Sequence, residues 1–300
     1  MASEQAEAIK EQLRVFSGSI DPNLELPEMR AMYADFASLT GEPQGITWTE
    51  VDAGGVPAIW ADPQGGADDR VLEYVHGGGY VIGAAQYYRK LTGHLANAIG
   101  CRVLNVDYRL APEHPHPAPV EDATTAYRWL LGQGVEPGHI AIAGDSAGGG
   151  LTVATLLSIR AAGLPMPAAA MPLSPWVDME GTGDSMITRA DRDVLVGADQ
   201  LKGMADAFLQ GQDPRDPLAA PLHADLSGLC PLYVQVGDDE TLLDDSVRLV
   251  ERARQAGVEC RLDVFPEMQH VFQMAAGNMP EADDAIGRLA EWVRPRLGLS

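Results

Sequence analysis

The sequence Gly144-Asp145-Ser146-Ala147-Gly148 places a serine between two glycines, where a short isoleucine–alanine run gives way to a long alanine- and leucine-rich run. This arrangement, between a predicted strand and a predicted helix, is typical of a nucleophile elbow. The glycines have a steric role, because a strained backbone at a sharp turn leaves no space for side chains two positions away. The motif therefore predicts that Ser146 is the nucleophile of an acyl-transfer reaction, with Asp145 as a hydrogen-bond acceptor that stabilises the turn.

Three other interpretations of this motif fit the sequence less well. An ordinary helix N-cap would not need a glycine on both sides of the serine. A phosphate-binding loop would continue with Gly-Lys-Ser or Gly-Lys-Thr, which does not follow here. A dinucleotide-binding turn needs its second glycine at the position that Ser146 occupies.

A second glycine-rich stretch could supply the donors that acyl transfer needs. The sequence His76-Gly77-Gly78-Gly79-Tyr80 follows directly after the strand-like run 71–75. Consecutive glycines let the backbone approach a substrate closely and point N–H groups at one oxygen atom. Each such donor typically stabilises the transition state by about 3–4 kcal/mol. We therefore expect an oxyanion hole at this loop.

Seven histidines could serve as the general base, and His270 fits best. It follows the last predicted strand, and it comes last in the chain order nucleophile, acid, base that is expected with an elbow of this kind. His76 belongs to the glycine loop. The remaining five precede strands, lie within a helix or lie in a proline-rich loop: His139 and His223, His94, and His114 and His116.

The carboxylate that orients this base must come from the acid-rich stretch after Val236. A run of acids at a strand end is usually a solvated loop and helix start, so only one of them need be catalytic. Any carboxylate that fixes the imidazole tautomer and stabilises its cation would serve. From the residues alone, four acids remain open: Asp238, Asp239, Glu240 and Asp244.

Together these stretches resemble the hormone-sensitive-lipase family of α/β-hydrolases, including its bacterial esterases. The resemblance runs from about residue 70 to 275. It rests on HGGGYVIG (76–83), DYRLAPEHPHPAP (107–119), GDSAGGG (144–150), SPWVD (174–178) and an acid followed by MQHVF.

The resemblance implies roles for particular residues. The family's D-x-L-x-D pattern falls on Glu240 to Asp244, which makes Glu240 the expected acid, with glutamate in place of the first aspartate. His76 would be structural, and Asp107-Tyr108-Arg109 would form a buttress beneath the site. The oxyanion donors would be Gly78, Gly79 and Ala147.

Strand-like and helix-like runs alternate along the chain in a way that could bring these residues together. This alternation predicts an α/β fold with a mostly parallel central sheet and helices on both faces. Ligands bind beyond the carboxyl ends of such strands. Strands are expected at 46–53, 56–61, 71–75, 102–107, 140–143, 168–173, 229–236 and 261–265, and helices at 86–99, 120–131, 147–162, 243–256 and 281–296.

Two segments fall outside this alternation. Residues 1–45 have helical apolar faces and are expected to form N-terminal cap helices, whereas 46–300 form the catalytic domain with a cap insertion at about 175–225. Tyr80 and Trp176 adjoin motif residues and are the preferred candidates for pocket walls. Further candidates from the insertion are Met179, Met186, Leu195, Val196, Met204 and Phe208.

Composition narrows the classes of partner. The net charge of −22 argues against binding to nucleic acid or to anionic membrane surfaces. We find no membrane-spanning run, no signal peptide and no CxxC pair among the three cysteines, which we expect to be buried free thiols; this favours a cytoplasmic enzyme. The sequence offers no HExxH or clustered ligand set, so we expect no metal and no organic cofactor.

The sequence thus predicts an esterase that hydrolyses short-chain soluble esters through an acyl-enzyme. An amidase, lactonase or arylformamidase would use the same triad and stays open. A ligand receptor on this scaffold is a further alternative, although such receptors typically lose the histidine. A homodimer is implied only by the family resemblance.

Overall fold

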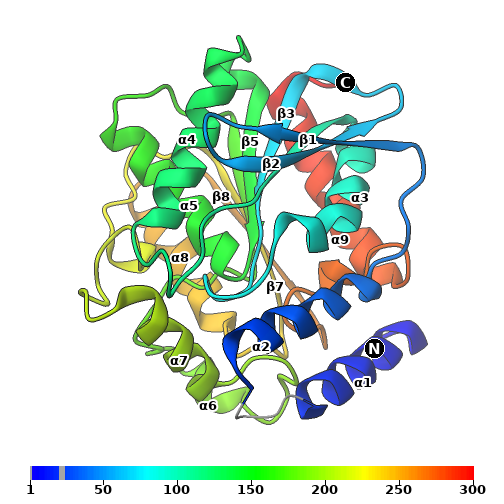
Figure 1. Ribbon diagram of the computed structural model, residues 1–300, viewed down its shortest axis with the longest axis vertical. Helices are drawn as coiled ribbons and strands as arrows, with labels where there is room; N and C mark the ends of the chain where they lie inside the picture. Colours follow the sequence, from blue (N-terminus) through cyan, green and yellow to red (C-terminus); the bar gives the residue numbers. More distant parts are fainter. Residues whose placement is uncertain (1, 20–23) are drawn as a thin grey trace.

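The computed structural model describes residues 2–19 and 24–300, and within them eight strands form one sheet (Figure 1). The strands are β1 (Ile46–Asp52), β2 (Pro57–Pro63), β3 (Ala67–Val75), β4 (Cys101–Val106), β5 (Ile140–Asp145), β6 (Ala169–Leu173), β7 (Leu232–Gly237) and β8 (Cys260–Phe265). Their order is β1-β2-β4-β3-β5-β6-β7-β8, with β2 antiparallel to both neighbours and all other pairs parallel. The predicted α/β fold with a mostly parallel sheet is confirmed.

Helices cover both faces of this sheet (Figure 1). One face carries α4 (Ala118–Gly132), α5 (Ala147–Ala161) and α8 (Leu243–Gln255), and the other carries α3 (Arg89–Ile99) and α9 (Pro280–Val293). Along β3, Val71 and Val75 pack into the first layer, whereas Leu72 and Tyr74 pack into the second. This alternation follows from the two-residue period of a strand, and it buries β3 on both faces.

Two segments far apart in the sequence lie along the lower side of the molecule in Figure 1. The first holds α1 (Glu4–Ser19), α2 (Leu26–Tyr33) and the 3-10 helix η1 (Ala34–Leu39), and the second holds α6 (Ser185–Thr188) and α7 (Ala198–Leu209). We call residues 2–19, 24–45 and 175–225 the cap, and the remaining described residues the body. Other short 3-10 helices are η2 (Ala85–Tyr88), η3 (Pro137–His139), η4 (Pro221–His223), η5 (Phe272–Ala275) and η6 (Arg294–Leu297).

Two local expectations were wrong, each for a physical reason. The strand expected from residue 229 begins only at Leu232, because Pro231 has no N–H to donate to a neighbouring strand. Cys260 is half-buried, since it lies on the edge strand β8; Cys101 and Cys230 are buried, and all three thiols are free. None of the described helices is long and apolar enough to cross a bilayer.

Candidate active site

Ser146 lies in the turn between β5 and α5 with a backbone conformation that few residues other than glycine adopt. Its φ is 54° and its ψ is −120°. The two flanking glycines are required by packing: a Cβ on Gly144 or on Gly148 would collide with the carbonyl oxygen of Val75 at the end of β3. The glycines therefore let the strand–turn–helix pack directly against β3, and the strain is confined to the serine.

His270 joins Ser146 to Glu240 through two hydrogen bonds. His270 Nε2 lies 2.8 Å from Ser146 Oγ, and His270 Nδ1 lies 2.8 Å from Glu240 Oε2. Both partners are buried, with 4% of His270 and 0% of Glu240 exposed. The other carboxylate oxygen of Glu240 accepts bonds from Ser174 Oγ at 2.7 Å and the Gly237 N–H at 2.5 Å. The carboxylate is thus fixed on both sides, and it fixes the imidazole.

The three competing acids make other contacts. Asp239 accepts from Lys10 Nζ at 2.8 Å and from the Gln269 amide at 3.3 Å. Asp244 accepts from the Ser185 N–H at 2.8 Å, and Asp238 pairs with Arg189. Of the four acids that the sequence left open, the structure brings Glu240 to the histidine.

Burial and the charges of neighbouring groups shift the pKa values of His270 and Glu240 in opposite directions. Burial lowers the pKa of His270, but the hydrogen bond and charge of Glu240, with the charges of Asp193 and Asp145, outweigh it and leave the pKa above the ordinary histidine value. Burial raises the pKa of Glu240, and its hydrogen bonds to His270 and Ser174 offset part of that rise. The arrangement favours a proton on the imidazole once it has been taken from the serine.

The loop after β3 brings two candidate oxyanion donors to this serine. Gly78 and Gly79 have φ values of 113° and 61°, and a Cβ on them would collide with Ile82 O and Met204 Sδ respectively. Among the described residues, no acceptor is hydrogen-bonded to the Gly78 or Gly79 N–H. Ala147 is the first residue of α5, where a helix N–H has no carbonyl partner within its own helix. All three predicted donors are therefore free to bind an oxygen.

Asp145 ties this loop to the nucleophile. Only 1% of Asp145 is exposed, and its Oδ1 accepts from Tyr74 Oη at 2.7 Å and from the Gly77 N–H at 3.0 Å, while Oδ2 accepts from Tyr88 Oη at 3.1 Å. Burial raises the pKa of Asp145 to about 6, against the hydrogen bonds from the two tyrosines. Its contacts extend beyond the turn in which we expected it to act.

His76 and Asp107 lie beneath the glycine loop. His76 is fully buried, with its Nδ1 2.7 Å from Gly77 O and its ring stacked on Tyr108 at 4.3 Å between centroids. Tyr108 Oη donates to His76 O at 2.6 Å, and Asp107 accepts from the Ala85 N–H at 2.7 Å. Burial lowers the pKa of His76, so its imidazole packs as a neutral ring.

A cavity of about 590 Å³ opens onto Ser146 and His270. The body lines it with the glycine loop, and both segments of the cap close it. From the N-terminal segment come Phe16, Ser17, Leu24, Leu26, Met29, Met32, Tyr33 and Phe36; from the second come Leu195, Val196, Asp199, Gln200, Leu201, Gly203 and Met204.

The expectation that Tyr80 and Trp176 wall this cavity was wrong. Each is 1% exposed, and neither lines the cavity. Tyr80 has a positive φ of 63°, and its ring stacks on Phe208 at 4.0 Å between centroids, with the Trp176 ring 6.1 Å from it. Of the other wall candidates, Leu195, Val196 and Met204 line the cavity, whereas Met179, Met186 and Phe208 do not.

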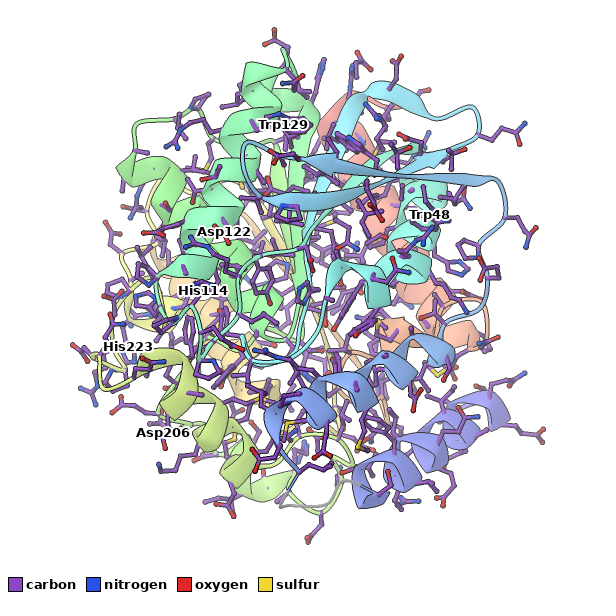
Figure 2. All side chains as sticks on the ribbon, in the orientation of Figure 1. Trp48, His114, Asp122, Trp129, Asp206 and His223 are labelled. Atoms are coloured by element: carbon purple, nitrogen blue, oxygen red, sulfur yellow. The ribbon has the colours of Figure 1, made fainter. Side chains whose placement is uncertain are left out.

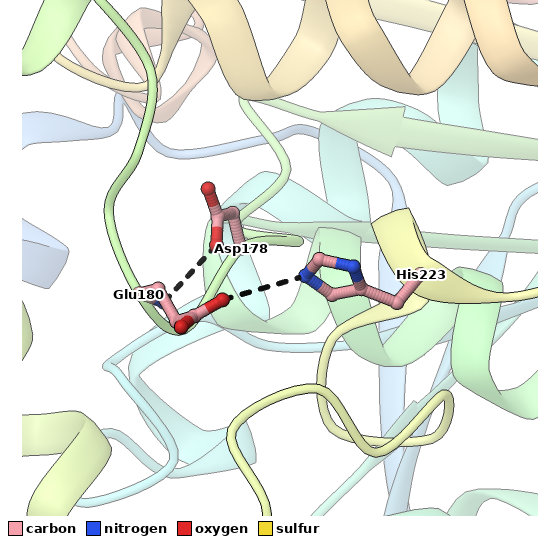
Figure 3. A group of neighbouring side chains, drawn as sticks. All are labelled: Asp178, Glu180 and His223. Carbon is pink, nitrogen blue, oxygen red and sulfur yellow. Dashed lines mark hydrogen bonds and ion pairs between the residues drawn. The ribbon is translucent and has the colours of Figure 1, made fainter.

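Two histidines that the sequence argued against lie on one side of the molecule, near α4 and α7 (Figure 2): His114 and His223. His223 is also part of a group with Asp178 and Glu180 whose geometry could hold a metal ion (Figure 3). However, Arg248 pairs with Asp178 at 3.0 Å and Arg215 pairs with Glu180 at 2.6 Å. Both carboxylates already have cationic partners. We therefore interpret this group as a network of ion pairs and not as a metal site.

Sequence reasoning missed two sets of residues. Ser174, which supports Glu240, stands within the quoted SPWVD stretch but was assigned no role. The sequence predicts that the N-terminal residues form the apolar faces of helices, but it does not predict that these residues line the cavity. Their apolar spacing, at Met29, Met32, Tyr33 and Phe36, was the available signal.

The chain is similar to known hydrolases and esterases. A family model described as the alpha/beta hydrolase fold matches residues 72–274. The chain is 42% identical to an acetyl-hydrolase of Streptomyces hygroscopicus over 302 residues, covering 99% of each, and 36% identical to an esterase of Acinetobacter venetianus, covering 74% of each. A solved structure of an esterase from the bacterial hormone-sensitive lipase family superposes with a TM-score of 0.96 at 45% identity, covering 99% of this chain and 100% of that chain.

Proposed function

The chain belongs to the bacterial hormone-sensitive-lipase family of α/β-hydrolases and is a carboxylic ester hydrolase, and we propose that it cleaves short-chain soluble esters through an acyl-enzyme formed on Ser146. The observation that carries this proposal is the pair of 2.8 Å hydrogen bonds from Ser146 through His270 to Glu240. A serine alcohol is a weak nucleophile unless a base takes its proton as it attacks.

In the first half of the proposed reaction, Ser146 Oγ attacks the ester carbonyl carbon while its proton passes to His270 Nε2. The negative charge that develops on the carbonyl oxygen is held by the N–H groups of Gly78, Gly79 and Ala147. Glu240 stabilises the imidazolium, which then protonates the leaving alcohol as the tetrahedral intermediate collapses to the acyl-enzyme. Water repeats these steps and releases the carboxylic acid.

The cavity lining supports neutral, apolar acyl groups. Among the described residues that line the cavity there is no lysine or arginine, whereas Asp145 and Asp199 are present, so an anionic substrate would meet like charge. The thioethers of Met29, Met32 and Met204 can adapt to acyl groups of different shape.

We place the enzyme in the cytoplasm, because its three cysteines are free. We expect no nucleic-acid partner at a net charge of −22.

The test is a series of p-nitrophenyl esters from acetate to decanoate, measured beside the matching p-nitroanilides. We expect the highest kcat/KM on acetate or butyrate and far lower turnover of the anilides, with Ser146→Ala inactive on all of them. A maximum at decanoate would overturn the short-chain preference, and anilide turnover equal to ester turnover would favour the amidase alternative.

A further inference from the structure

Helix α2 of the cap has two connections to the catalytic loops, although none of its residues is buried. One side of the helix lines the substrate cavity with Leu26, Met29 and Met32. Arg30 and Tyr33, one turn apart, make polar contacts with the body, and the ring of Tyr33 also lines the cavity. Leu26 and Met29 also pack against a buried apolar cluster, and the polar contacts of Arg30 and Tyr33 add two connections from α2 to the loops of the site.

Arg30 holds the backbone of the oxyanion loop. Its Nε donates to Val81 O at 2.9 Å, and its Nη2 donates to Ala111 O at 2.9 Å. The outer edge of the guanidinium forms a bidentate pair with Glu113, at 2.7 and 2.8 Å. One planar group therefore joins two backbone segments and a carboxylate, a geometry that a lysine cannot reproduce.

The segment that Arg30 holds contains the oxyanion donors. The N–H groups of Val81 and Ile82 both donate to Gly78 O, at 3.0 and 2.9 Å, and close the turn around Gly79. The second segment is joined to the same turn, because the Ala111 N–H donates to Tyr80 O at 2.8 Å. Arg30 thus contacts a turn whose residues Gly78, Gly79 and Ile82 line the cavity.

Tyr33 reaches the other end of the same loop through a relay of hydroxyl groups. Tyr33 Oη lies 3.1 Å from Tyr88 Oη, and Tyr88 Oη donates to Asp145 Oδ2 at 3.1 Å. A phenol has one proton, so Tyr88 must accept from Tyr33 when it donates to Asp145. Asp145 Oδ1 in turn accepts from the Gly77 N–H at 3.0 Å. The relay ends directly before Gly78.

We propose that Arg30 and Tyr33 are positioning residues of the hydrolytic reaction, which hold the Gly77–Ile82 turn so that its N–H groups meet the developing oxyanion. The inference rests on the proposed function, since it needs the Gly78 and Gly79 N–H groups to act as oxyanion donors. The cap then does more than enclose the substrate: the helix that contacts the acyl group also holds the donors that stabilise the transition state.

Misplacement of such donors by about 1 Å can cost roughly 100-fold in rate. We therefore expect Arg30→Lys to lower kcat by about 10- to 100-fold with KM changed by less than about threefold, because the substrate contacts remain. Tyr33→Phe keeps the ring in the cavity and removes only the hydroxyl, so we expect a smaller loss of kcat in the same direction. Thermal unfolding of each variant shows that the comparison is made on folded protein.

Glu113→Gln is the matched control. It removes the charge of the ion pair but leaves both carbonyl contacts of Arg30, and we expect its kcat to stay within about twofold of wild type. A loss in Glu113→Gln equal to that in Arg30→Lys would show that Arg30 acts only through the ion pair, which would overturn the assignment.

A short-chain trifluoromethyl ketone gives a second readout that a merely structural role would not move. Ser146 Oγ adds to the ketone carbon, the carbonyl electron pair becomes an oxyanion, and the serine proton passes to His270. We expect Arg30→Lys and Tyr33→Phe to raise the Ki of this ketone by the same factor by which they lower kcat/KM. The matching secondary alcohol, which forms no oxyanion, should inhibit all variants equally.

The outcomes separate this inference from the proposed function. If Ser146→Ala hydrolysed the ester at the wild-type rate, the proposed function itself would be refuted. If Ser146→Ala is inactive while Arg30→Lys and Tyr33→Phe keep wild-type kcat and ketone Ki, the esterase mechanism stands and the positioning role of α2 is refuted.

Discussion

The body and the cap hold the same site in different ways. In the body, Ser146, Glu240 and His270 follow the ends of β5, β7 and β8, strands that are paired along a continuous sheet. In the cap, the residues that line the cavity come from short helices joined to the body by separate polar contacts. The sheet therefore positions Ser146, Glu240 and His270, whereas the cap lines the cavity beside them and contacts the Gly77–Ile82 turn through α2.

One of these contacts lies beside Glu240, the carboxylate bonded to His270. Asp193 Oδ2 accepts from the Thr241 N–H at 2.9 Å and from Thr241 Oγ1 at 3.0 Å, and Oδ1 accepts from the N–H groups of Leu195 and Val196. The cap loop that lines the cavity is therefore attached to the residue after Glu240. Changes at Glu240 or His270 should alter kcat, and changes at the cap residues that line the cavity should alter selectivity. Arg30 and Tyr33 are the exception in the cap, because they contact the Gly77–Ile82 turn and its neighbours.

The largest effect expected is on the body, at the carboxylate. Glu240→Ala should lower kcat by roughly 10³- to 10⁴-fold, because the imidazole loses both its orientation and the partner of its cation. Asp244→Asn should stay within about tenfold of wild type, since Asp244 contacts Ser185 and not His270. Steady-state kcat on a short ester measures both, and the reverse order would contradict the assignment of the acid.

The pH profile should also depend on the body. His270 must be neutral to accept the serine proton, so kcat should fall about tenfold per pH unit below its pKa. Glu240 contributes to raising that pKa, so the acidic limb of wild type should begin at a higher pH than in Glu240→Ala. A flat wild-type profile between pH 5 and 8 would contradict the role of His270.

A cap substitution should change selectivity instead. The thioether of Met204 packs directly against Gly79, and Met204→Ala would enlarge the cavity beside the oxyanion donors. We expect the ratio of kcat/KM for octanoate to that for acetate to rise by roughly tenfold. Met186→Ala removes a cap methionine that does not line this cavity, and an equal change there would contradict the assignment.

The smallest effect on catalysis is expected from substitution of Glu73, which lies on β3 in the core of the body. It is fully buried, and neither carboxylate oxygen has a hydrogen-bond partner among the described residues. Burial raises its pKa well above the ordinary value. The folded state then retains a proton that the unfolded state has lost, so the free energy of unfolding should fall as pH rises from the ordinary glutamate pKa toward the raised one.

Glu73→Met should therefore increase the free energy of unfolding by about 1–3 kcal/mol at pH 8 and leave kcat nearly unchanged. Urea unfolding at pH 5 and pH 8 measures the change. Glu50→Met, on an exposed position of β1, serves as the control and should stay within about 0.5 kcal/mol of wild type. No gain in the buried variant would show that Glu73 is stabilised by its surroundings.

The sequence was most informative where local pattern and chain order coincide. Ser146 and His270 could be predicted to meet from the elbow motif and from strand–helix alternation, because both follow strand ends, and they lie within 2.8 Å of each other. The choice of Glu240 among four acids needed the family pattern, since a run of acids does not show which side chain points at the base. Adjacency to a motif gave a wrong prediction at Tyr80, whose ring is buried against Phe208 and does not line the cavity. The roles of Arg30 and Tyr33 depend on contacts more than 50 residues apart in the chain, which no local pattern contains.

The most direct test of the central claim is covalent labelling with a p-nitrophenyl alkylphosphonate, followed by intact-mass measurement and peptide mapping. The account predicts one phosphonyl group per chain, attached to Ser146, with activity lost in proportion to labelling and no label on Ser146→Ala. A label on any other residue, or full esterase activity in a chain whose Ser146 is labelled, would contradict it.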